Sequence, residues 1–150
     1  MKTPFRVGAI LFHEGKLVTT RMQKHVKTYH VLPGGGVEEH ETIYEALKRE
    51  LREELNIEIT KFRLVYMREL TITGYGRGLE LYFYIESYNG VPTKGHDPEK
   101  KESVLEDIDF LDLDELSKYT FYPVQLIGIL KEDRVNNFPE IKHLGLHTYP

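Results

Sequence analysis

The stretch from residue 33 to residue 57 constrains this chain more than any other part of it. Three successive glycines follow Pro33, and the chain then runs to Leu55 with no further Gly or Pro. Glycine lets backbone N–H and C=O groups approach a ligand with no Cβ in the way. After this glycine loop, apolar residues at helical spacing predict a helix that begins near Glu41 or Thr42 and ends near Leu55. One face of that helix carries Tyr44, Leu47, Leu51 and Leu55.

Three glutamates gather on the last turns of the predicted helix. Because an α-helix advances ~100° per residue, Glu53 and Glu54 lie about 60° and 40° to either side of Glu50. Such a patch standing alone is typical of a solvated helix face. Like charges at this spacing repel, and Arg49 and Arg52 offset only part of the repulsion. Mg²⁺ binds through a few carboxylates and substrate phosphates, so the glycines and glutamates together predict a metal site for cleaving diphosphates.

The rest of the chain reads as strands around this helix. In residues 79–88 the alternation places one set of side chains in the core, whereas Glu80, Tyr82 and Tyr84 fall on an opposite, polar face. The order of strands, helix, strands and helices predicts an α+β fold, with helices packed on a mixed β-sheet in one domain over residues 1–150. The tail from Val135 carries no clear pattern. Strands are expected over 6–12, 16–22, 29–32, 57–66 (continuing to 73), 79–88 and 104–111, and further helices over 112–119 and 123–133.

Composition excludes several classes of function. A chain of 150 residues is long enough for one core. The net charge of −4, with no basic block, argues against a stable nucleic-acid complex, which depends on neutralised phosphates. The chain has no cysteine, so disulfides and thiolate sites are excluded, which suits a cytoplasmic location. The apolar run near the N-terminus is too short for a signal peptide or a membrane span.

The glycine–carboxylate stretch resembles the signature of the Nudix hydrolases, G-x5-E-x7-R-E-U-x-E-E-x-G-U, in which U is aliphatic. Asn56 stands in place of the second signature glycine. Helices often end at a residue with positive φ, usually Gly and sometimes Asn, so Asn56 is expected to adopt that conformation. Residues 29–34 and 106–116 are similar to the family more loosely. The signature positions that match are Gly35, Glu41, Arg49, Glu50, Leu51, Glu53, Glu54 and Ile57.

The resemblance is to small, single-domain, MutT-like members and implies their fold and chemistry. The fold would be an α/β/α sandwich with a mixed sheet and the signature loop–helix. The activity would be that of a pyrophosphohydrolase acting on phosphoric anhydrides, in which metal-activated water attacks a nucleoside diphosphate linked to another group. Nucleoside triphosphates, oxidised nucleotides and ADP-ribose are substrates of this type. The cofactor would be Mg²⁺, with Mn²⁺ as a substitute.

The resemblance also implies roles for particular residues. Glu50, Glu53 and Glu54 would bind the metal together with the Gly35 carbonyl, and Arg49 would orient a neighbouring carboxylate. Glu53 or Glu54 would help to deprotonate the water. Glu41 would be structural or an outer ligand. The family's general base often lies outside the signature, and Glu106 is preferred here over Glu102.

Residues that recognise the substrate are sought outside the signature. Arg21 and Arg77 are candidates for phosphate contacts, and Tyr29 is a candidate for stacking on a base. Tyr82 is a candidate for lining a pocket from the polar face of its strand. For both aromatic residues, ordinary packing is the alternative. The expected partner is a small nucleotide, with no membrane association, and pairing as a homodimer stays open.

Other functions fit less well. A non-catalytic Nudix-fold binding or regulatory module is the main alternative, but such modules usually lose signature carboxylates, and this chain keeps them all. Isopentenyl-diphosphate isomerase chemistry needs a catalytic cysteine, which the chain lacks. Nucleic-acid decapping is not supported, because the sequence shows neither the signal of a basic groove nor an added domain.

Overall fold

The computed structural model describes residues 2–95 and 104–149, with side chains described for 3–95 and 107–148. This part of the chain forms two five-stranded sheets and four short or medium helices. The helices are α1 (Ile43–Leu55) and α2 (Leu130–Val135), with the 3-10 helices η1 (Leu113–Lys118) and η2 (Val124–Gly128). The strands are β1 (Lys2–Ile10), β2 (Phe12–His13), β3 (Lys16–Lys24), β4 (Lys27–Val31), β5 (Gly34–Glu38), β6 (Glu58–Ile72), β7 (Gly76–Asn89), β8 (Val104–Leu111), β9 (Phe121–Tyr122) and β10 (Lys142–Tyr149).

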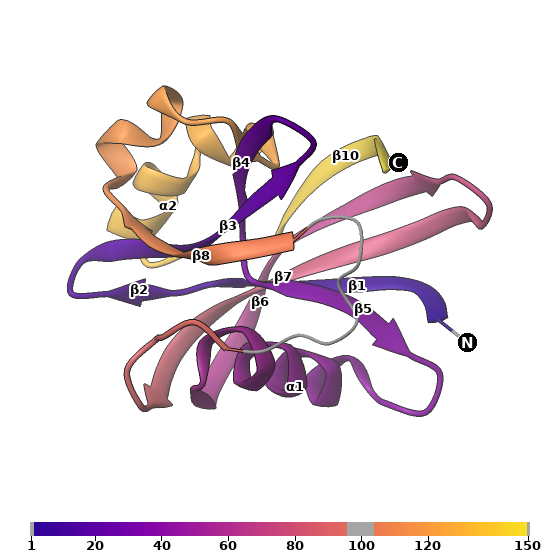
Figure 1. Ribbon diagram of the computed structural model, residues 1–150, viewed down its shortest axis with the longest axis horizontal. Helices are drawn as coiled ribbons and strands as arrows, with labels where there is room; N and C mark the ends of the chain where they lie inside the picture. The colour runs from indigo at the N-terminus through magenta and orange to yellow at the C-terminus, as the bar shows by residue number, and fades with distance from the viewer. Residues whose placement is uncertain (1, 96–103, 150) are drawn as a thin grey trace.

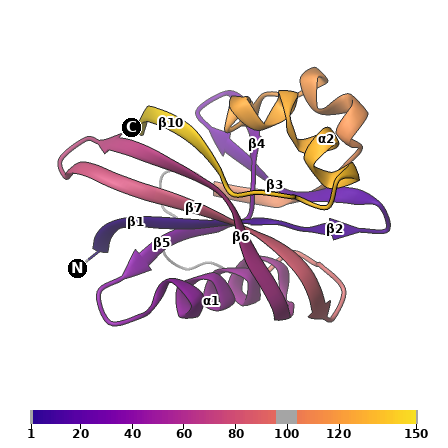
Figure 2. The same cartoon turned by 180° about the vertical axis from the view of Figure 1, so that it is seen from behind.

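The first sheet has the strand order β10-β6-β7-β1-β5. It is mixed, because β1 runs parallel to β7 and β10 parallel to β6, whereas β6 and β7 are antiparallel. In the second sheet β3 pairs with β2, β4 and β8, and β4 pairs in parallel with β9. Helix α1 lies on one side of the sheets and α2 on the other, with the 3-10 helices beside it (Figure 1 and Figure 2). The predicted α+β sandwich is therefore confirmed, with two mixed sheets instead of one.

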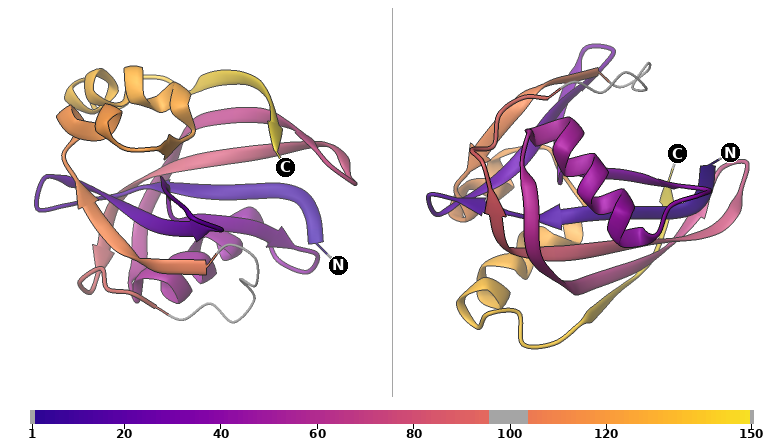
Figure 3. Two further views of the ribbon diagram at one scale, coloured as in Figure 1. Left: turned by 45° about the horizontal axis from the view of Figure 1, so that its top comes forward. Right: turned by 90° about the horizontal axis from the view of Figure 1, so that it is seen from below.

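Two apolar cores hold these layers together. The first lies between α1 and the first sheet and contains the helix residues Ala46, Leu47, Leu51 and Leu55. The second lies on the opposite face of the first sheet and contains Phe121, Leu126 and other residues from the C-terminal third of the chain. Figure 3 shows α1 and the C-terminal helices covering opposite sides of the strands. Among the described residues, no helix has the length and apolarity needed to cross a bilayer.

The prediction that one face of β7 is polar and open is wrong. Tyr82 is 2% exposed and belongs to the second core, and Tyr84 packs against the same core. The alternation of the strand is real, but both of its faces are covered, because the C-terminal helices lie over the face opposite α1. Tyr82 therefore does not line an open pocket in this structure.

Three further elements differ from those expected from the sequence. The three glycines form strand β5, in which Gly34 and Gly36 lie opposite Gly8 and Arg6 of β1, instead of an irregular loop. The unassigned tail forms β10, which pairs with β6. The helix expected over 123–133 is divided into η2 and α2, and Pro123 is the N-cap residue of η2.

Helix α1 follows local rules and begins and ends where the sequence predicts. Thr42 caps its N-terminus by accepting a hydrogen bond from the Glu45 N–H, and the Glu45 side chain accepts one from the Thr42 N–H. Asn56 ends the helix with φ 57° and ψ 36°, and its N–H donates to the Arg52 carbonyl. The expected positive φ at Asn56 is confirmed.

A buried carboxylate, Glu80, ties three strands of the first sheet together. Arg6 of β1 donates to its Oε2 at 3.1 Å, and Arg68 of β6 contacts its Oε1 at 2.6 Å. The Tyr82 hydroxyl also donates to Oε1. Burial by itself would raise the pKa of Glu80, but the charges of Arg6 and Arg68 and this hydrogen bond outweigh burial and hold the pKa below its ordinary value of 4.5.

Glu80→Gln is expected to lower the free energy of unfolding by about 2–4 kcal/mol at neutral pH, since it removes the buried charge that compensates the partly buried Arg6 and Arg68. A lowered folded-state pKa means that the stabilisation is fully present above pH 4.5 and is lost as the pH falls below it. Urea unfolding at pH 7 and pH 3 measures this, and the difference between variant and wild type should shrink at pH 3. Glu69→Gln, which breaks exposed pairs with Arg77 and His143, is the control and should change little. An equal difference at both pH values would contradict the assignment.

Candidate functional site

The candidate site lies where strand β5 runs beside the last turns of α1. The Gly34 N–H donates to the Glu54 carboxylate at 2.9 Å. Gly35 lies against Glu50, since a Cβ built on Gly35 would stand 2.4 Å from Glu50 Oε1. Glu50 and Glu54 are almost inaccessible to solvent, with 6% and 1% of each residue exposed. A side chain at position 35 would therefore displace the Glu50 carboxylate, whereas one at position 34 would meet the backbone of Val7 in β1.

Arg49 is the central cation of this site. Its Nε and Nη2 both donate to the Glu41 carboxylate, at 3.0 and 2.5 Å. Its Nη1 donates to Glu50 Oε1 at 2.9 Å and to Glu53 Oε2 at 3.4 Å. Nη2 also donates to the Gly36 carbonyl at 3.0 Å. One guanidinium thus links α1 to β5 and to the loop that precedes the helix.

The charges around Arg49 shift two pKa values. The hydrogen bond to Glu41, which outweighs burial, and the charge of Glu50 raise the pKa of Arg49 above its ordinary value. The same hydrogen bond lowers the pKa of Glu41, and the Glu38 N–H, which donates to Glu41 at 2.9 Å, acts in the same direction. Glu41 is therefore held ionised as a bridge between the loop and the helix, which suits the expected structural or outer role.

The residues present suit a hard cation. Glu50 Oε2 is buried and has no hydrogen-bond partner in the described structure, which is costly for a carboxylate oxygen. Arg49 is shared by Glu41, Glu50 and Glu53, so the group keeps an excess of negative charge. The side chains are not gathered as a coordination shell: within residues 3–95 and 107–148, no three His, Asp or Glu groups are arranged to hold one ion. Glu50 and Glu53 turn to Arg49, and Glu54 turns to Gly34.

The predicted metal and catalytic residues on α1 thus lie together, whereas the predicted substrate residues do not. Arg21, on β3, contacts Asp109 at 3.3 Å and Asp107 at 3.9 Å. Tyr29, on β4, pairs across the sheet with Met22, the neighbour of Arg21. Because successive residues of a strand point to opposite faces, Arg21 and Tyr29 lie on opposite faces of the second sheet.

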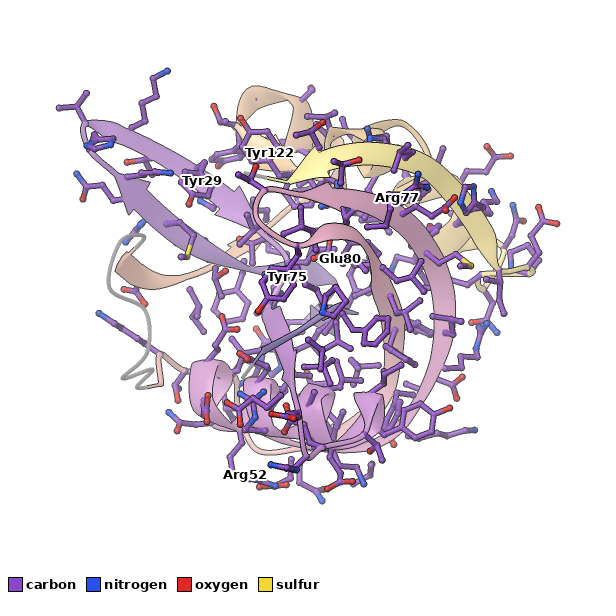
Figure 4. The ribbon with its side chains drawn as sticks, turned by 90° about the vertical axis from the view of Figure 1, so that its right-hand side faces the viewer. Tyr29, Arg52, Tyr75, Arg77, Glu80 and Tyr122 are labelled. Atoms are coloured by element: carbon purple, nitrogen blue, oxygen red, sulfur yellow. The ribbon has the colours of Figure 1, made fainter. Side chains whose placement is uncertain are left out.

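Tyr29 lies in an aromatic pair. Its ring meets the ring of Tyr122 edge to face, with centroids 5.9 Å apart, and Figure 4 shows the two side by side. Tyr122 immediately precedes the N-cap of η2 and is not part of any motif in the sequence. Sequence reasoning missed this pair because β4 and β9 meet only through tertiary folding.

Of three other candidates, Arg77 lies apart from the signature helix, and the side chains of Glu102 and Glu106 are outside the described residues. Arg77 is 60% exposed by its side chain and pairs with Glu69 on the β6–β7 hairpin, far from α1 in Figure 4. Glu106 lies in β8, but its side chain is outside the described residues, and Glu102 is outside them altogether. The general base therefore stays a prediction.

Comparison with known proteins places these features in a family. The sequence model of the NUDIX domain matches residues 2–129. An 8-oxo-dGTP diphosphatase of Buchnera aphidicola subsp. Schizaphis graminum is 33% identical over 87 residues, which span 57% of this chain and 64% of that protein.

Solved structures share the fold. The solution structure of the E. coli ORF135 protein superposes with a TM-score of 0.69 at 23% identity, covering 88% of this chain and 91% of that one. A NUDIX hydrolase from Nitrosomonas europaea gives 0.68 at 18% identity, with 91% of both chains covered. A MutT NUDIX hydrolase from Burkholderia pseudomallei gives 0.61 at 21% identity, covering 75% and 84%.

Proposed function

Since the chain belongs to the NUDIX family, we propose that it is a Mg²⁺-dependent pyrophosphohydrolase that cleaves a nucleoside diphosphate linked to another group. The observation that carries the proposal is the complete set of carboxylates on α1, with Glu50 and Glu54 buried against the glycine strand. Non-catalytic modules of this fold usually lose signature carboxylates, and this chain keeps them all. The 8-oxo-dGTP diphosphatase relative supports a nucleoside triphosphate or an oxidised nucleotide as the substrate class, with ADP-ribose as a third candidate.

Glu50, Glu53 and Glu54, with the Gly35 carbonyl, are the groups that would hold Mg²⁺, or Mn²⁺ in its place. When bound, the ion would lower the pKa of water and neutralise charge on the phosphates. Arg49 orients the carboxylates of Glu50 and Glu53, because its Nη1 donates to both. The glutamates that would bind the metal and the arginine that orients two of them therefore lie in the last two turns of α1.

A carboxylate must also accept the proton of the attacking water. The water oxygen bonds to phosphorus as the bridging oxygen leaves with its electron pair, and the proton passes to the base. Glu53 suits this role within the signature, since its side chain is 34% exposed, whereas Glu54 is buried and accepts the Gly34 N–H. Glu106 is the candidate base outside the signature. Arg21 and Tyr29 remain candidates for substrate contacts, on opposite faces of the second sheet.

A panel of nucleoside triphosphates, oxidised nucleotides and ADP-ribose, incubated with Mg²⁺ in ¹⁸O-labelled water, tests the proposal. We expect one class to be hydrolysed to a nucleoside monophosphate, and mass spectrometry of the products to locate the label on one phosphorus. The same panel without divalent metal is the control. Calorimetry showing tight nucleotide binding with Mn²⁺, together with no turnover of any compound, would favour the binding module instead.

The proposal extends to the protein's partner, location and oligomeric state. A small nucleotide as the partner suits a cytoplasmic location, and a homodimer would be detected by light scattering of the purified chain.

A further inference from the structure

The segment that follows β7 folds back onto the C-terminal end of α1. The Thr93 N–H donates to the Leu55 carbonyl at 2.9 Å, and the Gly95 N–H donates to the Glu54 carbonyl at 2.9 Å. Carbonyls in the last turn of a helix have no partner within the helix. Residues 92–95, which we call the clamp, therefore supply hydrogen-bond donors to two carbonyls in the turn that carries Glu53 and Glu54. Pro92 is buried and anchors the start of this segment.

Gly95 brings the clamp into direct contact with the helix backbone. A Cβ built on Gly95 would lie 1.7 Å from the Glu53 carbonyl oxygen and 3.0 Å from the Glu54 carbonyl carbon. These neighbours are main-chain atoms, so they cannot turn aside as the end of a side chain would. Any larger residue must displace the clamp, and position 95 thus requires glycine for this packing.

Asn56 binds the clamp through its side chain. Its side-chain amide donates to Thr93 Oγ1 at 3.1 Å and to the Lys94 carbonyl at 3.1 Å. The glycine that the Nudix signature has at this position would adopt the same left-handed backbone but has no amide to donate. The substitution in this chain therefore preserves the helix end and adds two contacts to a segment more than thirty residues away in sequence.

We propose that Asn56 and Gly95 are positioning residues for the carboxylates of Glu53 and Glu54. A helix end frays unless its last turn is tied down, and α1 ends at Leu55, directly after these two residues. A metal site tolerates displacements of its ligands of only about 0.5 Å. The clamp holds the last turn through two backbone hydrogen bonds, and Asn56 holds the clamp. This inference rests on the proposed function, because it assigns to both residues an effect on metal binding.

Four purified variants test the proposal through Mn²⁺ affinity, measured by calorimetry on the full chain without nucleotide. Asn56→Gly keeps the backbone conformation and removes both side-chain contacts, and we expect the Kd for Mn²⁺ to rise about tenfold. Gly95→Ala displaces the clamp, and the Kd should rise about 10–100-fold. Thr93→Val removes one acceptor, and the Kd should rise by less than in Asn56→Gly, because only one of the two Asn56 contacts is lost. Gly128→Ala is the matched control, since a Cβ there meets nothing within 4 Å.

Hydrogen exchange gives a second readout that does not depend on metal. The Thr93 and Gly95 amides should be protected in wild type and should exchange at least about tenfold faster in Asn56→Gly. Wild-type Mn²⁺ affinity in both Asn56→Gly and Gly95→Ala would overturn the inference while leaving the proposed function intact. Wild type that neither binds Mn²⁺ nor hydrolyses any nucleotide would overturn both, and the wild-type protein alone identifies that outcome.

Discussion

Glu54→Gln is expected to lower kcat for the nucleotide substrate by about a hundredfold or more, without unfolding the protein. Glutamine has the shape of glutamate and keeps an oxygen that accepts the Gly34 N–H, so the packing of β5 against α1 is retained. The variant lacks only the negative charge that a divalent cation needs. Glu53→Gln should show a loss of similar size, because we propose its carboxylate as a metal ligand or as the base. Steady-state rates with Mg²⁺ and thermal unfolding of the same preparations measure both effects.

The control for these variants is Glu58→Gln. Glu58 follows the same helix and forms an exposed ion pair with Arg52, outside the group around Arg49. Its replacement removes one negative charge from the same end of α1, and activity should stay at the wild-type level. If Glu53→Gln and Glu54→Gln also retain wild-type rates, the metal-dependent mechanism is wrong.

Arg49→Lys is expected to reduce both stability and activity, although it conserves the charge. Lysine has no planar fork, so it cannot contact Glu41 through two nitrogens while it also reaches Glu50, Glu53 and the Gly36 carbonyl. The carboxylates are then left partly uncompensated in a site with little solvent. We expect a loss of about 2–4 kcal/mol in the free energy of unfolding. A fall in kcat of about 10–100-fold should accompany it, because Glu50 and Glu53 lose their orienting partner.

Urea unfolding with and without Mn²⁺ checks this expectation. A bound cation would replace part of the charge compensation, so Mn²⁺ should recover some of the lost stability. Arg52→Lys provides the matched control, since Arg52 lies on the same helix and its guanidinium pairs with Glu58 on the exposed side. It should unfold like wild type. Equal stabilities for Arg49→Lys and Arg52→Lys would contradict the central role of Arg49.

The helix and its carboxylates were predictable because the forces that shape them are local. Helical periodicity places Glu50, Glu53 and Glu54 around one side of α1. The capping box at Thr42 begins the helix, and Asn56, in the left-handed conformation, ends it, each at a position where its residue type is favoured. The spacing of these residues was enough to identify the family, since it reflects how one helix presents its side chains.

Tertiary structure decided what surrounds the helix. The polar alternation of β7 is present in the sequence, but only the packing of the C-terminal helices buries Tyr82. The glycines become a strand because β1 pairs with them, and the tail becomes β10 because β6 offers an edge. Each of these outcomes depends on a partner far along the chain, which a local pattern does not encode.

The sequence by itself therefore determined the helix, its cap and the residue types of the site. Only the folded chain brought Gly35 against Glu50, Arg49 against Glu41 and Gly36, and residues 92–95 against the last turn of α1. The physical reason is the range of the interactions. Helical period and capping act over a few residues, whereas strand pairing and close backbone contact join segments whose separation in sequence says nothing about their distance in space.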